Sequence, residues 1–192
     1  MKLVYFHGFM SSGASGTVES LRRMLPELEV CAPDIPVDPA DALPYLKQYV
    51  AEQQPDIIVG TSMGAMYAQQ MFGYKKICVN PSFNMSTMSK VMKAGTTYPF
   101  QNGRKDGQKT FRITGQIVKN FNMMERQQFK GITDFDRENT YGLFGTNDTT
   151  VNCYDLFKKY YTHAQRFDGE HRLNDKSLKN AVVPLVKQIL GI

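Results

Sequence analysis

Short apolar runs alternate along the chain with longer stretches in which apolar residues recur at the spacing of a helix. The apolar runs are rich in Val, Ile and Tyr, as buried strands are. Such strands, separated by amphipathic helices, are typical of βαβ units, so the pattern predicts an α/β fold with a doubly wound, mostly parallel sheet covered on both faces. The predicted strands are 3–6, 28–35, 56–60, 75–80, 139–145 and 164–169, and the predicted helices are 17–25, 39–53, a segment after Ser62, 151–161 and 175–190.

Length and composition favour one globular domain. A chain of 192 residues with 42% hydrophobic content can bury one substantial core but is short for two. The charged fraction of 21% and the lack of low-complexity tracts argue against disordered and fibrous classes. No apolar run approaches the roughly 18 residues of a membrane span. Because the first predicted strand begins near residue 2, we expect no secretory signal.

The cysteines indicate a reducing compartment. Cys31, Cys78 and Cys153 are an odd number at wide spacings, and the sequence has no CxxC pair. This usage is typical of free thiols, so we expect a cytoplasmic protein in which Cys78 and Cys153 pack in the core.

The alternation is interrupted between Asn80 and Glu138, where glycines and short polar segments accumulate. A compact domain rarely needs so long a segment for connection alone, so such insertions are usually functional. We therefore expect a single domain over 1–192 with a cap-like insertion at about 81–138, above the carboxyl edge of the sheet.

Three methionines mark this insertion. Met85, Met88 and Met92 are spaced to lie on one face of a predicted helix. Because methionine is flexible and apolar, they either seat the cap on the core or line a site that moulds to an acyl chain.

The net charge of +5 resides in the same insertion. Between Pro81 and Glu138 the chain has ten basic residues against five acidic ones, and elsewhere the two signs balance. A basic cap could attract an anionic substrate such as an acyl-CoA thioester, although charged residues more often simply face solvent. A nucleic-acid-binding protein is a rival hypothesis, but the basic residues are dispersed and no recognition motif accompanies them.

The segment 56–72, DIIVGTSMGAMYAQQMF, starts as a buried strand and ends as a helix. Between the two lies a Gly-x-Ser-x-Gly motif at 60–64. In this context the motif predicts a nucleophile elbow, a turn so sharp that side chains two residues either side of the serine would collide. The elbow glycines Gly60 and Gly64 therefore make room, and Ser62 projects from the sheet edge.

A serine hydroxyl needs a neighbouring base to act as a nucleophile at neutral pH. The chain has three histidines. His7 ends the first strand, before a loop suited to approach a substrate with backbone amides, and His163 lies at a helix-to-strand junction typical of a solvated or capping side chain. His171 directly follows the last strand, in FDGEHRL, where such sheets collect reactive groups. We predict that His171 is the base.

The base needs a carboxylate to orient it, and in the chain order Ser, Asp, His this acid lies between Ser62 and His171. Asp148 follows the penultimate strand, in GLFGTNDTTVN, and is the predicted acid. An aspartate at this point could instead cap the following helix. Asp168 and Glu170 are alternatives, but they are too close to His171 in sequence to support its ring from across the site.

An acyl-transfer intermediate also needs donors to its oxyanion. The backbone amide of Met63, at the start of the helix after the nucleophile, is one candidate, because the helix dipole favours negative charge there. The loop after the first strand is expected to supply the other oxyanion-hole amide, from Phe9 or its neighbour Met10.

Four motifs in this order, YFHGFMSSG, GTSMGA, GTNDTTVN and GEHRL, resemble the α/β-hydrolase superfamily and more closely its small YqiA-like esterase branch. The resemblance covers nearly the whole chain. It implies a Ser62, Asp148, His171 triad, an intracellular location, no cofactor or metal, and activity on esters or thioesters. Ala65 and Glu170 depart from the glycines that are frequent at these positions of the branch, and neither departure removes a reacting group.

The sequence therefore predicts a serine hydrolase that cleaves small-molecule carboxylic esters or thioesters through an acyl-enzyme intermediate, without nucleic-acid partners. The substrate is expected to be anionic if the basic insertion contacts it. An acyl-CoA thioesterase or acyltransferase on the same triad is one alternative. A non-catalytic hydrolase-fold scaffold is another, although a silent relative would be expected to have lost one of the three residues.

Overall fold

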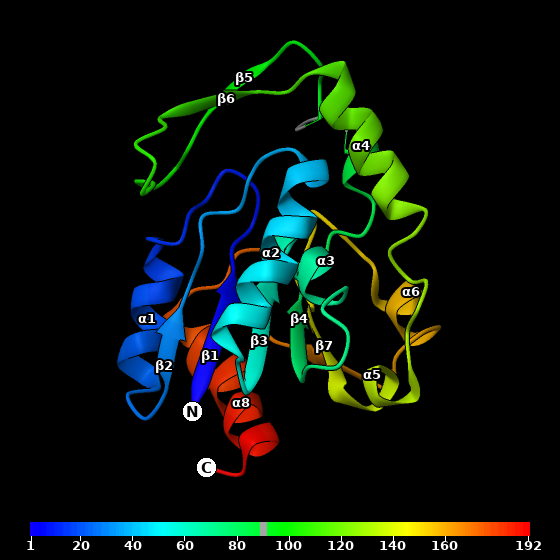
Figure 1. The fold of residues 1–192 in the computed structure, drawn as a ribbon. Coiled ribbons are helices and arrows are strands. Elements are labelled where there is room, and N and C mark those ends of the chain that lie inside the picture. Colours follow the sequence, from blue (N-terminus) through cyan, green and yellow to red (C-terminus); the bar gives the residue numbers. More distant parts are fainter. Residues whose placement is uncertain (89–91) are drawn as a thin grey trace.

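The computed structural model describes residues 1–88 and 92–192, which form a single α/β domain around one sheet (Figure 1). The strands of this sheet are β1 (Lys2–Phe6), β2 (Glu29–Cys31), β3 (Ile57–Thr61), β4 (Lys76–Val79), β7 (Thr140–Gly145) and β8 (His163–Phe167). They are parallel throughout and have the order β2-β1-β3-β4-β7-β8. The predicted fold class is therefore confirmed.

Helices cover both faces of the sheet (Figure 1). They are α1 (Gly16–Met24), α2 (Pro39–Gln53), α3 (Met63–Ala68), α6 (Tyr154–Lys158), α7 (Asp175–Ser177), the π-helical turn η2 (Leu178–Val182) and α8 (Val183–Leu190). Side chains of α1, η2 and α8 share one hydrophobic cluster, and those of α2, α3 and α6 share the other. The sheet thus separates two cores.

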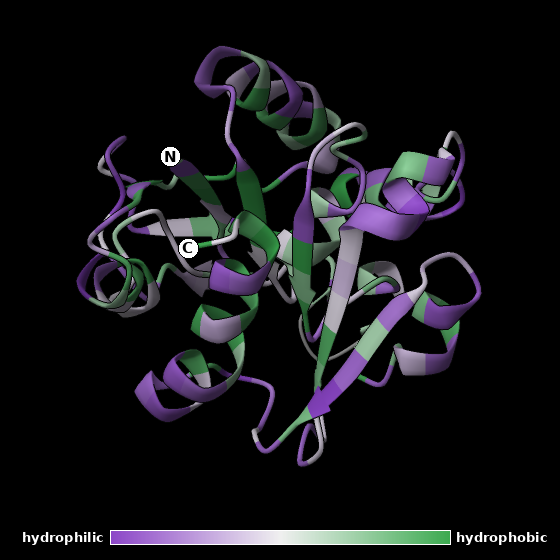
Figure 2. Cartoon of the chain, turned by 90° about the horizontal axis from the view of Figure 1, so that it is seen from below, coloured by the Kyte–Doolittle hydropathy of each residue, from purple (hydrophilic) through white to green (hydrophobic). Residues whose placement is uncertain are grey.

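The side chains of β1 show why this segment forms a central strand. Leu3 and Tyr5 belong to the cluster on the α1 side of the sheet, whereas Val4 and Phe6 belong to the cluster on the α2 side. All four are buried. Because successive side chains of a strand point to opposite faces, an uninterrupted apolar run serves both cores at once. In Figure 2 several strands are coloured as apolar along most of their length, and the helices are coloured as polar on their outer sides.

Between β4 and β7 the chain leaves the sheet. The elements of this segment are the 3₁₀ turn η1 (Met85–Thr87), the strands β5 (Thr97–Pro99) and β6 (Thr110–Arg112), and the helices α4 (Gly115–Glu125) and α5 (Asp134–Asn139). The antiparallel β5–β6 pair and α4 lie above the carboxyl edge of the sheet, where we expected a cap, and α5 returns the chain to the start of β7 (Figure 1).

The predicted helix through the three methionines falls partly on residues 89–91, which lie outside the described residues. Within the described part of the segment, a 3₁₀ turn spans Met85–Thr87, and the amide of Met92 donates to the carbonyl of Met88 at 2.8 Å. Met85 and Met92 are buried in the cluster on the α2 side of the sheet. Their burial favours the interpretation that they seat the insertion on the core.

Some predicted boundaries were too generous. The strand expected at 28–35 is limited to β2, since Pro33 has no amide hydrogen with which to continue a ladder. The helix expected at 151–161 is limited to α6.

Among the helices in the described part of the chain, none combines the length and apolar character that a membrane crossing requires.

A buried ion pair fixes the point where the insertion rejoins the sheet. Nζ of Lys76 on β4 lies 2.6 Å from Oδ1 of Asp136 on α5, and both side chains are fully buried. The carboxylate also accepts hydrogen bonds from the amide of Gly73 at 2.9 Å and the hydroxyl of Thr133 at 2.7 Å. Burial lowers the pKa of Lys76. Burial opposes ionisation of Asp136, but the hydrogen bonds it accepts hold its pKa below the ordinary value.

Candidate active site

Ser62 lies at the junction of β3 and α3 in a backbone conformation that residues other than glycine rarely adopt, with φ 54° and ψ −118°. Strain of this kind costs on the order of 1–3 kcal/mol and persists only where the surroundings hold it. Here the amide of Ser62 donates to the carbonyl of Val79 at 2.9 Å. Its carbonyl accepts from the amides of Ala65 at 3.1 Å, Met66 at 3.2 Å and Ser82 at 3.1 Å. The turn is therefore pinned from both sides.

At both elbow glycines, neighbouring backbone atoms leave no space for a side chain. A Cβ atom at Gly60 would lie 2.5 Å from the carbonyl oxygen of Gly64 and 2.7 Å from Cα of Ala65. A Cβ atom at Gly64 would lie 2.1 Å from the carbonyl oxygen of Phe6. These positions are already filled by backbone, so only glycine allows β3, α3 and β1 to approach so closely.

The side chains of Ser62, His171 and Asp148 form a hydrogen-bonded series at the carboxyl edge of the sheet. Oγ of Ser62 lies 3.0 Å from Nε2 of His171, and Nδ1 of His171 lies 2.8 Å from Oδ2 of Asp148. An ionised carboxylate can only accept, so Nδ1 of the neutral ring donates to Asp148 and Nε2 is left to accept the proton of Ser62. The structure therefore brings the three predicted residues together in the predicted order.

Asp148 uses its two carboxylate oxygens differently. Oδ1 accepts hydrogen bonds from the amides of Thr150 at 2.8 Å and Val151 at 3.1 Å, which closes a turn, while Oδ2 faces the imidazole. The following helix, α6, has Cys153 as its N-cap, so the alternative interpretation of Asp148 as a helix cap is wrong. The turn that carries it is tied to the loop after β8, because the amide of Asn147 donates to the carbonyl of Gly169 at 2.9 Å. One side chain therefore makes both sets of contacts.

The other acids considered lie elsewhere. Asp168 is exposed and pairs with Lys176 at 3.0 Å. Glu170 has an exposed side chain and uses its backbone carbonyl to accept a hydrogen bond from Asn80. Among the described contacts of the His171 ring, neither carboxylate occurs.

The other two histidines have structural surroundings. His7 is buried, with Nδ1 2.8 Å from the carbonyl oxygen of Gly8 and Nε2 accepting from the amide of Ile35 at 3.0 Å. Burial lowers the pKa of His7 to about 4, so the ring is neutral at physiological pH and holds the loop after β1. His163 begins β8, and its ring stacks on Tyr141 with centroids 4.6 Å apart.

A cleft of about 1020 Å³ runs along the carboxyl edge and contains both Ser62 and His171. It lies where the sheet order reverses, since β2 and β3 flank β1 on opposite sides. Open α/β sheets bind their ligands at such points. Phe9 lines the cleft on the β1 side, and Met85 and Met88 line it from the insertion.

The two predicted oxyanion donors flank Ser62. Met63 is the first residue of α3, and Phe9 follows Gly8, whose Cβ position would lie 3.5 Å from Cβ of Ser62. Within the described residues, no group accepts a hydrogen bond from the amide of either Phe9 or Met63. The neighbouring Met10 has φ 63°, and its carbonyl accepts from the amide of Gln101 at 2.8 Å, which links this loop to the insertion.

Sequence reasoning missed Asn80, which directly follows β4. It is buried and has φ 44°, a left-handed conformation that asparagine tolerates. Its Nδ2 donates to the carbonyls of Glu170 at 2.9 Å and His171 at 3.2 Å, and its Oδ1 accepts from the amide of Gly145 at 2.7 Å. The sequence feature that could have indicated Asn80 is a polar residue directly after the strand that neighbours β3.

Sequence reasoning also missed Ser82. Its Oγ lies 2.9 Å from Oγ of Ser62, and the side chain is buried. The signal was again its place in the short polar turn after β4, where Pro81 separates it from Asn80.

The charge of the insertion is not directed into this cleft. The charged residues that line it are Glu170, Arg172 and Asp175, none of which belongs to the insertion. The guanidinium of Arg104 instead pairs with Asp106 at 2.9 Å and stacks on Phe100 at 4.4 Å. The described basic residues of the insertion therefore lie outside the cleft.

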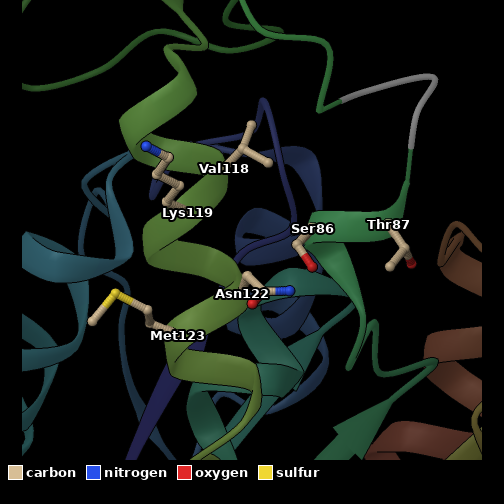
Figure 3. A pocket seen from close by; sticks show the side chains of 6 residues that line it. All are labelled: Ser86, Thr87, Val118, Lys119, Asn122 and Met123. Atoms are coloured by element: carbon tan, nitrogen blue, oxygen red, sulfur yellow. The ribbon is translucent and has the colours of Figure 1, made fainter.

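A second cavity of about 420 Å³ lies between η1 and α4, apart from the predicted site residues. Figure 3 shows Asn122 of α4 and Ser86 of η1 pointing toward one another within it. Across the described ranges, no group of three or more His, Cys, Asp or Glu side chains is arranged to hold a metal ion.

Residues 2–180 match the model of the Uncharacterised protein family (UPF0227). The chain belongs to this family. The matched range contains Ser62, Asp148 and His171, and the UPF0227 family is the YqiA-like branch that the four sequence motifs resemble.

Solved structures of α/β hydrolases share the fold of this UPF0227 chain. Est1E from Butyrivibrio proteoclasticus matches it with a TM-score of 0.70 and 13% identity, over 100% of this chain and 88% of that one. Alpha/beta hydrolase domain-containing protein 10 from mouse matches with a TM-score of 0.63 and 11% identity, over 99% and 89%. The thioesterase domain from the curacin biosynthetic pathway matches with a TM-score of 0.58 and 16% identity, over 98% and 90%. The chain therefore has the α/β-hydrolase fold.

Proposed function

We propose that this UPF0227 protein is a serine hydrolase that cleaves carboxylic esters or thioesters of small molecules through an acyl-enzyme intermediate. The observation that carries the proposal is the series from Oγ of Ser62 to Nε2 of His171, at 3.0 Å, and from Nδ1 to Asp148, at 2.8 Å. A hydroxyl, an imidazole and a carboxylate joined in this way are what an activated serine requires. The strained turn at Ser62 supports the same role, because such strain clusters at reacting groups.

In the first step, Oγ of Ser62 attacks the acyl carbonyl carbon while Nε2 of His171 takes the hydroxyl proton. The carbonyl oxygen becomes an oxyanion, and the amides of Phe9 and Met63 are the proposed donors to it. Collapse breaks the bond to the alcohol or thiol, which leaves with the proton from His171. Asp148 orients the ring and stabilises the imidazolium without itself taking the proton.

In the second step, water attacks the acyl carbon and gives a proton to His171. The second tetrahedral intermediate breaks the bond between the acyl carbon and Oγ, and His171 returns the proton to Ser62. The products are a carboxylic acid and the free enzyme. The reaction balances without any further reactant, and an acceptor other than water would make the same triad an acyltransferase.

The apolar residues that line the cleft favour a partly apolar acyl group. Phe9, Met85 and Met88 offer apolar contacts, and neutral polar residues such as Asn102 lie among them. The size of the cleft suits a small-molecule ligand. The described basic residues of the insertion lie outside the cleft, so they do not favour acyl-CoA over other thioesters.

The test is hydrolysis of short p-nitrophenyl esters and of matched thioesters by the wild type and the Ser62→Ala variant. We expect Ser62→Ala to lower kcat on the order of 10⁴-fold or more. Thr140→Val is the control, because the Thr140 hydroxyl is buried, has no hydrogen-bond partner in the described structure and lies at the opposite edge of the sheet. A wild type without turnover on any ester or thioester would favour the non-catalytic scaffold instead.

A further inference from the structure

We propose that Ser82 is an additional catalytic residue, whose hydroxyl donates a hydrogen bond to the nucleophilic oxygen of Ser62 and assists its departure from the acyl-enzyme. The inference rests on the proposed function and assigns a further group to the same reaction. It starts from one distance, the 2.9 Å between the two Oγ atoms. Ser82 therefore touches the atom that forms and breaks the covalent bond.

The direction of this hydrogen bond follows from the partners of Ser62. Its hydroxyl has one proton, and Nε2 of His171 accepts that proton, because Nδ1 of the same ring donates to Asp148. Oγ of Ser62 can then only accept from Ser82. Within the described residues, Oγ of Ser62 is the one hydrogen-bond partner of the Ser82 hydroxyl. Its proton is therefore directed at the nucleophile.

The backbone holds Ser82 in this position. The amide of Ser82 donates to the carbonyl of Ser62 at 3.1 Å, and the amide of Ser62 donates to the carbonyl of Val79 at 2.9 Å. Between these contacts, Asn80 has φ 44° and Pro81 has a fixed φ, so the turn has little freedom. The side chain of Ser82 is only 1% exposed, so water cannot readily replace its hydroxyl. The contact between Ser62 and Ser82 is therefore buried and fixed by the backbone, unlike a chance contact between two surface serines.

The donor is most useful when Oγ of Ser62 carries negative charge. Charge accumulates there when the second tetrahedral intermediate collapses, since the electron pair of the breaking bond between carbon and Oγ moves onto the oxygen. His171 supplies the proton at that moment, and the Ser82 hydrogen bond stabilises the charge before the transfer is complete. Hydrogen bonds to charged groups are stronger than those between neutral ones. During acylation the same bond mainly orients the hydroxyl, so removing it should slow deacylation more than acylation.

The experiment separates the two steps in Ser82→Ala. Stopped-flow release of p-nitrophenol from p-nitrophenyl butyrate measures acylation, and intact mass after rapid removal of the ester follows the decay of the acyl-enzyme. We expect decay to slow on the order of 10-fold and acylation to change by less than about threefold, because one donor to a charged oxygen is lost. Ser82→Cys retains a similar size with a weaker donor, so it should slow decay by an intermediate factor. Thr140→Val should behave as the wild type.

Two results would overturn the inference. One is decay in Ser82→Ala and Ser82→Cys within about twofold of the wild type. The other is an equal slowing of both steps together with a lowered thermal midpoint, which is what a purely structural serine would cause. A wild type that forms no acyl-enzyme contradicts the proposed function itself, whereas an active wild type with an unaffected Ser82→Ala variant contradicts only the role of Ser82.

Discussion

The side chain of Asn80 donates a hydrogen bond to the backbone carbonyl of His171, at 3.2 Å, and so holds the proposed base from outside its own loop. The same Nδ2 donates to the carbonyl of Glu170 at 2.9 Å, and Oδ1 accepts from the amide of Gly145 at the end of β7. The bridge thus joins the loop of His171 to the strand that leads to Asp148. One amide side chain sets the separation between the proposed base and the proposed acid.

We predict that Asn80→Asp disturbs catalysis more than folding. The substitution has nearly the same shape but replaces two donated hydrogens with a group that repels the carbonyls of Glu170 and His171. We expect kcat to fall on the order of 10- to 100-fold with a smaller change in KM. The reason is that losing the hydrogen bonds to buried carbonyl groups costs roughly 1–3 kcal/mol. Steady-state kinetics on an ester measures the effect.

Asn139→Asp is the matched control. Asn139 is exposed, and its Nδ2 donates to the carbonyl of Phe135 on the same helix, so the same chemical change there should leave kcat unaltered. Wild-type kinetics in Asn80→Asp would show that the bridge does not position His171.

His7 should make the protein less stable in mild acid. Its pKa is about 4 in the folded state because the ring is buried, whereas its ordinary value is 6.5. Between these values the unfolded chain binds a proton that the folded protein does not, so the free energy of unfolding falls as pH decreases from 6.5 to 4. The loss from this group approaches about 3 kcal/mol, and the contribution is fully present above pH 6.5.

The measurement is chemical denaturation of the wild type and of His7→Gln at several pH values. The amide side chain introduced by this substitution does not titrate, so the difference in unfolding free energy between the two proteins should be largest near neutral pH and shrink toward pH 4. A difference that does not vary over this range would mean that His7 has an ordinary pKa.

Removing one charge of the buried Lys76–Asp136 pair should lower the free energy of unfolding more than removing both charges together. Asp136→Asn leaves the Lys76 ammonium buried without its counter-charge, and breaking such a pair typically costs about 3–5 kcal/mol. Lys76→Met combined with Asp136→Asn removes both charges and should recover part of that loss. The denaturation midpoints of the single and double variants measure this recovery of stability. Equal destabilisation by both variants would argue against an ion pair between Lys76 and Asp136.

The sequence was enough to predict the fold and the proximity of Ser62, His171 and Asp148, because each lies in a recognisable local pattern. The elbow needs glycine on both sides of Ser62, and the other two residues follow strands whose apolar runs are conspicuous. Asn80 and Ser82 left no such pattern, since their importance comes from contacts with residues that are distant along the chain.

The insertion was the least predictable region, for a related reason. Met85 and Met92 are buried against the core, a placement that their spacing along the chain does not reveal. The basic residues suggested a contact with substrate, but side chains such as Arg104 are engaged by partners within the insertion. Composition located the segment but not the direction of its side chains.

The most direct test of the central claim is covalent labelling with a fluorophosphonate followed by peptide mass mapping. We predict one adduct on Ser62 in the wild type, no adduct in Ser62→Ala, and labelling slowed on the order of 10³-fold or more in His171→Ala, since the hydroxyl would lack its base. An ester-hydrolysing wild type that carries the adduct on another residue, or that labels equally fast without the His171 imidazole, would contradict the account.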